Sequence, residues 1–248
     1  MSSLIENLKR FNSKERYFLV DYATKGGFEL SDKFREDVSK ALNLELPESP
    51  TFVAMDYHLD WLLASLVLEK FPGWELYEDK DLPKFQNQKT DIEATQEDED
   101  LPKFKKLEND IEATQEDIDF IIAFDKGEET HIVLLEVKGV TGWTNKQLNS
   151  KAVHLDKIDK ILDSDEKCYQ GVFFHFAIFS PKKPTERLKL TKGPKWMKSK
   201  ANDEVVWIKL PLGTKDLPLE IKDLWKVERC DKDRKRGKNG KWWTVKPR

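Results

Sequence analysis

The stretch Asp117–Lys138, DIDFIIAFDKGEETHIVLLEVK, contains two apolar runs that are separated by a short polar segment. The runs Ile118–Phe124 and His131–Lys138 are rich in Ile, Val, Leu and Phe, which is typical of strands buried on two faces. Gly127 lies between the two runs and favours a turn there. The stretch therefore predicts a hairpin of two adjacent strands at the centre of the fold.

Three charged residues, Asp119, Glu136 and Lys138, interrupt this apolar hairpin. Alternate residues of a strand share a face, so Glu136 and Lys138 project to the same side. The start of the first strand lies opposite the end of the second, which brings Asp119 close to them. Buried charges are costly unless they are paired or bind a metal. We therefore consider either a structural Glu136–Lys138 ion pair or a carboxylate site for Mg²⁺ or Mn²⁺.

The order Asp119, sixteen intervening residues, then Glu136-Val137-Lys138 resembles the PD-(D/E)XK superfamily of restriction enzymes, junction resolvases and repair nucleases. The resemblance implies an α/β, restriction-endonuclease-like αβββαβ core with a central mixed sheet flanked by helices. It also implies that Asp119, Glu136 and the Val137 carbonyl bind Mg²⁺ or Mn²⁺, and that Lys138 positions the attacking water. No Pro precedes Asp119, and Asp117 remains an alternative first ligand.

The segment 52–71 is expected to form a helix before the sheet, because its apolar residues recur at helical spacing. The predicted buried stripe consists of Met55, Leu59, Leu62 and Leu66. Asp56 and Asp60 would then share a second face, one turn apart. In the resembled superfamily this helix often carries an extra acidic ligand, a role that we assign to Asp60 and, as second choice, to Asp56. The alternative is a solvated helix edge.

The remaining core elements follow in the order that the resembled fold requires. A strand is predicted at Trp74–Tyr77, a helix at Thr144–Leu162, and strands at Gly171–Ser180 and Val205–Leu210. Gln147 and Lys151 lie one turn apart on the predicted helix. Superfamily members often place Gln or Lys at this position, so we expect both to contact nucleic acid. Helix capping by Gln147 and solvation of Lys151 are the alternatives.

A tandem repeat precedes the hairpin. The sequence DLPKFQNQKTDIEATQED at 81–98 recurs as DLPKFKKLENDIEATQED at 100–117, with an offset of 19 residues. Two short copies cannot form a solenoid, and only the second copy continues into an apolar strand. We therefore interpret residues 82–119 as containing a local duplication in a loop of the core.

Basic residues are concentrated in the C-terminal third, although the formal net charge of the chain is −3. Segments 182–200 and 226–248 hold eight and ten Lys or Arg residues, and tryptophans are interspersed among them. Such surfaces suit phosphate backbones and stacked bases. The second segment reads as a hairpin, Leu224–Cys230 and Lys241–Val245, with a basic tip. From it we expect nucleic-acid contacts by Arg234, Lys235, Arg236 and Trp242, the alternative being solvated surface.

Three regions are expected: a helical segment 1–50, a nuclease-like α/β core 51–215 and a basic hairpin 216–248. The first contains predicted helices at 5–11 and, after the N-cap Ser31, at 32–42. A substrate-binding or homodimer contact is the role we consider for it. No apolar run has the length of a membrane span, no signal-peptide core is present, and the two cysteines form no CxxC pattern. We therefore expect a cytoplasmic protein without a membrane partner.

Several other chemistries lack their motifs. The sequence has no GxxxxGK[ST], GxGxxG, GxSxG or HExxH pattern. The leading hypothesis is thus a metal-dependent endonuclease that hydrolyses phosphodiester bonds in DNA with Mg²⁺ or Mn²⁺ as cofactor. The alternative is a non-catalytic nucleic-acid- or protein-binding module on a nuclease-like fold.

Overall fold

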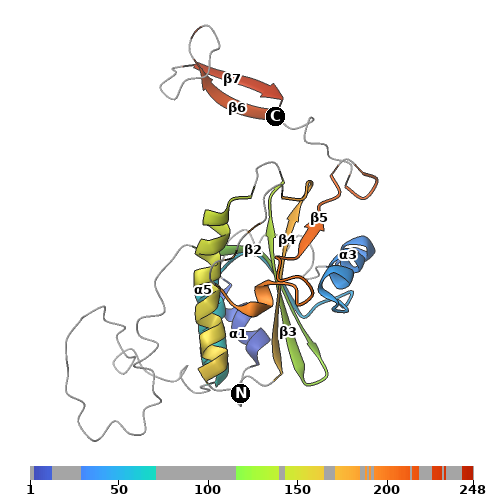
Figure 1. Cartoon of the computed structure of the whole chain (residues 1–248), viewed down its shortest axis with the longest axis vertical. Helices are drawn as coiled ribbons and strands as arrows, with labels where there is room; N and C mark the ends of the chain where they lie inside the picture. The colour runs from blue at the N-terminus through green and yellow to red at the C-terminus, as the bar shows by residue number, and fades with distance from the viewer. Residues whose placement is uncertain are drawn as a thin grey trace, which may run out of the picture.

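The computed structural model describes residues 3–12, 29–70, 116–139, 143–164, 171–184, 188, 190, 193–212, 214–217, 225–230, 232 and 242–247. Within them, a five-stranded mixed sheet is flanked by helices on both faces (Figure 1). The predicted strand Trp74–Tyr77 and the repeat up to residue 115 lie outside the described residues.

The sheet has the order β1-β2-β3-β4-β5. Neighbours β1, β2 and β3 are antiparallel, whereas β3, β4 and β5 are parallel. The strands span Phe52–His58 (β1), Asp117–Lys126 (β2), Glu129–Val137 (β3), Val172–Ser180 (β4) and Trp207–Lys209 (β5). The predicted central hairpin is confirmed as β2 and β3, and the two later strands as β4 and a shorter β5.

The C-terminal hairpin is also confirmed. It consists of β6 (Trp225–Cys230) and β7 (Trp242–Pro247), which pair antiparallel and form a two-stranded sheet of their own. Figure 1 shows this hairpin near the C-terminus of the chain.

Four α-helices and one short 3₁₀ helix are described. They are α1 (Leu4–Phe11), α3 (Asp32–Leu42), α4 (Leu59–Lys70), α5 (Asn145–Ser164) and η3 (Lys195–Met197). The predictions for α1, α3 and α5 are confirmed. The Ser31 hydroxyl accepts a hydrogen bond from the Phe34 amide at 3.4 Å, as expected of an N-cap.

The predicted helix 52–71 is wrong over its first seven residues, which form β1. The helix begins only at Leu59, so Asp56 and Asp60 do not share a helix face, and Met55 is 38% exposed on a strand. The physical reason is tertiary: the backbone of β1 pairs with β2 from Phe52↔Ala123 to His58↔Asp117. This strand pairing outweighs the helical spacing of the apolar residues, which taken alone favours a helix. Helix α4 consequently lies between the first and second strands.

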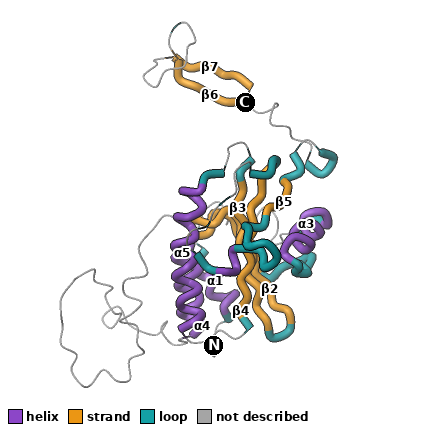
Figure 2. The backbone as a smooth tube through the Cα atoms, viewed as in Figure 1, coloured by secondary structure: helices purple, strands orange, loops and turns teal. Residues whose placement is uncertain are grey.

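Two apolar cores cover the two faces of the sheet. Helices α1, α4 and α5 pack on one face, and α3 packs on the other (Figure 2). Helix α1 is attached by buried Leu4, Ile5 and Leu8, and the Tyr57 hydroxyl donates to the Leu8 carbonyl at 2.9 Å. The N-terminal helices therefore form part of the packed core. Among the described helices, none combines the length and apolar character needed to cross a membrane.

Candidate functional site

Strands β1 and β2 each contain an irregularity at the same level of the sheet, where the alternation of side chains between the two faces is interrupted. We call this irregularity a dislocation. Ala54 and Tyr57 belong to the same core although they are three residues apart, and so do Ile118 and Ile121. A regular strand would place such pairs on opposite faces. The dislocation lies at Asp56, whose φ of 50° is left-handed, and at the facing residue Asp119, since the partner pairs skip this level.

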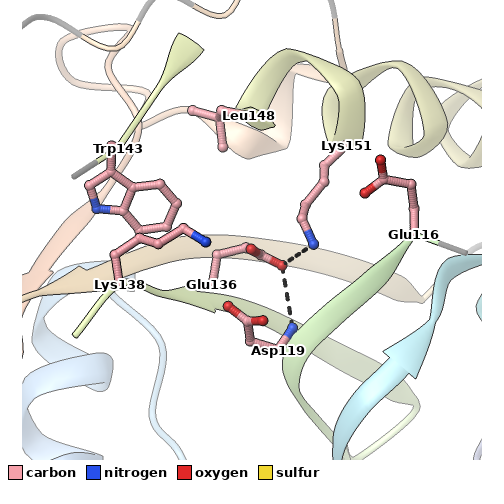
Figure 3. A pocket seen from close by; sticks show the side chains of 7 residues that line it. All are labelled: Glu116, Asp119, Glu136, Lys138, Trp143, Leu148 and Lys151. Atoms are coloured by element: carbon pink, nitrogen blue, oxygen red, sulfur yellow. Dashed lines mark hydrogen bonds and ion pairs between the residues drawn. The ribbon is translucent and has the colours of Figure 1, made fainter. Parts of the chain in front are cut away.

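Asp119 consequently reaches two cavities, one on each face of the sheet. The cavity on the α5 face has a volume of about 260 Å³. Figure 3 shows that its lining comes from the start of β2, the end of β3 and the first half of α5. The lining residues are Glu116, Asp119, Glu136, Lys138, Trp143, Leu148 and Lys151. The three residues singled out from the sequence, Asp119, Glu136 and Lys138, are thus brought together.

Glu136 is the buried centre of this cavity, with only 2% of its surface exposed. Its Oε1 atom lies 2.7 Å from the Lys151 Nζ and accepts a hydrogen bond from the Asp119 amide at 3.3 Å. The Asp119 carboxylate in turn accepts from the Val137 amide at 2.7 Å. Burial raises the pKa of Glu136 to about 7, with Lys151 lowering it and Asp119 adding to the rise.

The two lysines of the cavity differ in their contacts. Lys151, on α5, pairs with Glu136 and also donates to the Asp117 carbonyl. Lys138 instead holds its Nζ 5.7 Å from the centroid of the Trp143 ring, which is a cation–π distance. The structural Glu136–Lys138 pair considered from the sequence is therefore replaced by a Glu136–Lys151 pair.

The competing aspartates are separated by the structure. Asp117 directs its carboxylate to His58, with 2.6 Å between Oδ1 and Nδ1, whereas Asp119 lines the cavity. Asp60 lies in the first turn of α4 and is not among the lining residues. The third carboxylate of the cavity belongs to Glu116, which accepts from the Ser150 hydroxyl at 2.9 Å.

Sequence reasoning missed Glu116 and Trp143 as site residues. Glu116 stands immediately before β2, and its carbonyl accepts from the Leu59 amide at 3.0 Å, so the entry of β2 is held against α4. The available signal was the acidic run Glu116-Asp117 directly before the apolar strand. Trp143 gave no sequence signal beyond its place close to the Lys138 strand end.

The expected nucleic-acid contacts are largely beyond the described part of the chain. Gln147 lies in the first turn of α5 and Trp242 begins β7, but their side chains are outside the described residues, as are Arg234, Lys235 and Arg236. Only Lys151 of this set has a described side chain, and it contacts Glu136.

Two carboxylates of the cavity are candidate ligands for a divalent cation. Among the described residues, no group of three or more His, Cys, Asp or Glu has an arrangement that could hold a metal ion. Asp119 and Glu136 nevertheless present oxygen ligands of the kind that Mg²⁺ and Mn²⁺ prefer. The Asp119 charge raises the pKa of Glu136, and a cation between two carboxylates relieves this repulsion.

Comparison with known proteins adds no relative. No family model, no curated protein and no solved structure matches this chain. The chemistry of the site is therefore argued from its own geometry.

Proposed function

We propose that this chain is a metal-dependent nuclease that hydrolyses phosphodiester bonds in DNA, of the PD-(D/E)XK type that its spacing resembles. One observation carries the proposal: Asp119, Glu136 and Lys138 line a single cavity from the facing ends of β2 and β3. The mixed sheet flanked by helices is compatible with the coarse α/β class of the expected core, although α4 lies between β1 and β2.

Each residue of the cavity has a proposed part. Asp119, Glu136 and the Val137 carbonyl would hold Mg²⁺ or Mn²⁺, which would stabilise charge on the phosphate and lower the pKa of a bound water. Lys138 lies beside the carboxylates and positions the attacking water. Lys151 pairs with the buried Glu136 carboxylate, which would be costly without a partner.

We propose that the phosphate backbone of the DNA binds along the edge of the sheet where the parallel strands end. The Lys138 amide donates to the Phe179 carbonyl at 2.9 Å, so the end of β4 lies beside the cavity. Lys182 and Lys183 follow β4 at this edge and are exposed. Open α/β sheets bind ligands at the carboxyl ends of their parallel strands, and these lysines offer cations to a polyanion there.

The decisive experiment incubates the protein with supercoiled plasmid, single-stranded DNA and branched DNA in Mg²⁺ or Mn²⁺. Cleavage is expected with the wild type and not with Glu136→Ala or in EDTA. Calorimetry should detect Mn²⁺ binding that Glu136→Ala removes. Full cleavage by Glu136→Ala would place the chemistry elsewhere.

The second candidate is a module that binds nucleic acid or protein without cutting. Two observations favour it: Lys151 already pairs with Glu136, and no three-ligand group is present among the described residues. In this case Mn²⁺ does not bind, and DNA or a protein partner is retained with EDTA present. A homodimer also remains a prediction, which sedimentation would test.

A further inference from the structure

The second cavity that Asp119 reaches lies on the α3 face of the sheet and has a volume of about 340 Å³. Its wall is formed by Met55, Phe120, Leu135, Val137 and Phe179 from the sheet and by Phe34 from α3. Met55 and Val137 are 38% and 41% exposed. Cavities of this size with apolar walls and a few polar groups are typical of small-molecule sites.

Three aromatic rings, those of Phe34, Phe120 and Phe179, line this cavity. The rings of Phe34 and Phe179 are stacked, with centroids 5.8 Å apart and an interplanar angle of 13°. Phe120 meets Phe34 edge-on, at 82° and 6.1 Å. Flat aromatic surfaces stack on nucleobases regardless of sequence.

The polar rim of the cavity is acidic. Asp37, Asp119 and Asp216 all line it, and the ammonium of Lys33 is paired with Asp37 at 2.6 Å. Carboxylates accept hydrogen bonds from the amino groups of bases but repel phosphate. The cavity on the opposite face holds Lys138 and Lys151, which attract phosphate. Asp119 lines both cavities, and their different charges suit the phosphate and the base of one nucleotide.

We propose that the α3-face cavity binds one unstacked nucleobase of the substrate strand, next to the phosphate that enters the cavity lined by Lys138 and Lys151. This inference rests on the proposed nuclease function and deepens it: the substrate is DNA that is single-stranded or locally unpaired at the cleavage position. A base inside an intact duplex would first have to be extruded, which costs a few kcal/mol for unstacking and unpairing.

Methyl NMR on methionine-labelled wild-type protein tests the site with nucleosides alone. The chain has 3 methionines; Met55 lines the cavity, and Met197 is fully buried in the other core and serves as internal control. Adenosine, cytidine or guanosine should shift the Met55 methyl signal and leave that of Met197 unchanged. If no nucleoside shifts the Met55 methyl signal, the proposal is overturned. If only an apolar peptide shifts this signal, the proposal is also overturned, in favour of a protein partner.

Oligonucleotides test the position relative to the cleaved phosphate. A series with a single abasic nucleotide at successive positions is bound in EDTA, where no cleavage occurs, and affinity is measured by fluorescence anisotropy. One position should weaken binding at least about fivefold, which corresponds to the loss of one stacked base. Met55→Trp, which fills the cavity, should abolish this dependence while Mn²⁺ binding persists. Equal affinity for all abasic positions in the wild type overturns the proposal.

Failure of this inference and failure of the nuclease function give different results. If DNA is cleaved but nucleosides do not shift the Met55 methyl signal, only the proposed base site is wrong. If nucleosides shift Met55 but neither Mn²⁺ binding nor cleavage occurs, the nuclease function is wrong and the nucleobase site stands.

Discussion

At the scale of single residues, the buried carboxylate of Glu136 couples the site to the stability of the protein. Its pKa is raised from 4.5 to about 7, mainly by burial, so the folded state binds more protons than the unfolded state between these values. Stability from this group is therefore present below pH 4.5 and is lost as the pH rises through 7. The full loss is on the order of 3 kcal/mol.

Glu136→Gln should remove this loss because the amide stays neutral. The melting temperature of the variant, measured in EDTA, is expected to rise relative to wild type between pH 4.5 and pH 8. Glu48→Gln, at an exposed position, is the matched control and should follow the wild-type profile. A constant difference between Glu136→Gln and wild type across this range would contradict the assignment.

The two lysines of the cavity should separate stability from chemistry. Lys151→Met leaves the Glu136 charge buried without its partner and should cost about 3 kcal/mol at pH 8, but much less at pH 5, where Glu136 is protonated. Lys138→Met loses only a cation–π contact, worth about 1 kcal/mol or less, yet it should abolish plasmid cleavage. Denaturant unfolding at the two pH values and a nicking assay measure both effects. Equal stability losses in the two variants at pH 8 would refute this division.

At the scale of elements, the dislocation shared by β1 and β2 sets the position of Asp119. Asp56 adopts a left-handed backbone with φ of 50° inside a strand, and the facing level of β2 is Asp119. A left-handed backbone costs a residue with a Cβ roughly 1–2 kcal/mol, and more for a β-branched residue. We infer that the dislocation turns the Asp119 carboxylate toward the Val137 amide and the two cavities.

Substitutions at Asp56 test this inference. Asp56→Asn and Asp56→Gly, both compatible with positive φ, should keep the fold and Mn²⁺ binding. Asp56→Val should destabilise the protein by about 2 kcal/mol or more and weaken Mn²⁺ binding by displacing Asp119. Thermal unfolding and calorimetry provide the two readouts. If the Val variant matches the Gly variant in both, the left-handed backbone has no part in the site.

At the scale of the whole molecule, the 19-residue repeat lies between α4 and β2 in the sequence, outside the described residues. Deletion of 82–100 rejoins Asp81 to Leu101, restores DLPKF and shortens the segment 71–115 from 45 to 26 residues. For a flexible connection this change stabilises the fold by about 0.5 kcal/mol. The deletion leaves Leu59 and Glu116 in the chain, so the hydrogen bond from the Leu59 amide to the Glu116 carbonyl can still form.

We therefore expect the deletion variant to melt at nearly the wild-type temperature and to bind Mn²⁺. Two substitutions serve as a matched pair: Asp119→Asn should abolish Mn²⁺ binding, and Asp100→Asn, at the position 19 residues earlier, should not. An unfolded deletion variant would mean that the first copy packs into the core. Damage by Asp100→Asn alone would mean that Asp100, rather than Asp119, supplies the ligand.

Local sequence was sufficient for the elements whose signals are short in range. The N-cap Ser31, the apolar runs around Gly127 and the periodicity of α5 each depend on neighbours within a few residues, and all three elements form as predicted. The meeting of Asp119 with Glu136 and Lys138 was also predictable, because strand alternation and hairpin geometry determine which residues face one another.

Only the tertiary structure decided the features that depend on contacts between distant segments. Phe52–His58 becomes a strand because β2 offers it a backbone partner more than fifty residues away, although its apolar spacing also suits a helix. Glu136 pairs with Lys151 because α5 packs across β3, which no spacing within either segment encodes. The left-handed Asp56 is set by paired strands, and with it the access of Asp119 to both cavities. Short-range periodicity thus determined the elements and the charges they carry, whereas long-range pairing and packing determined the partners of those charges.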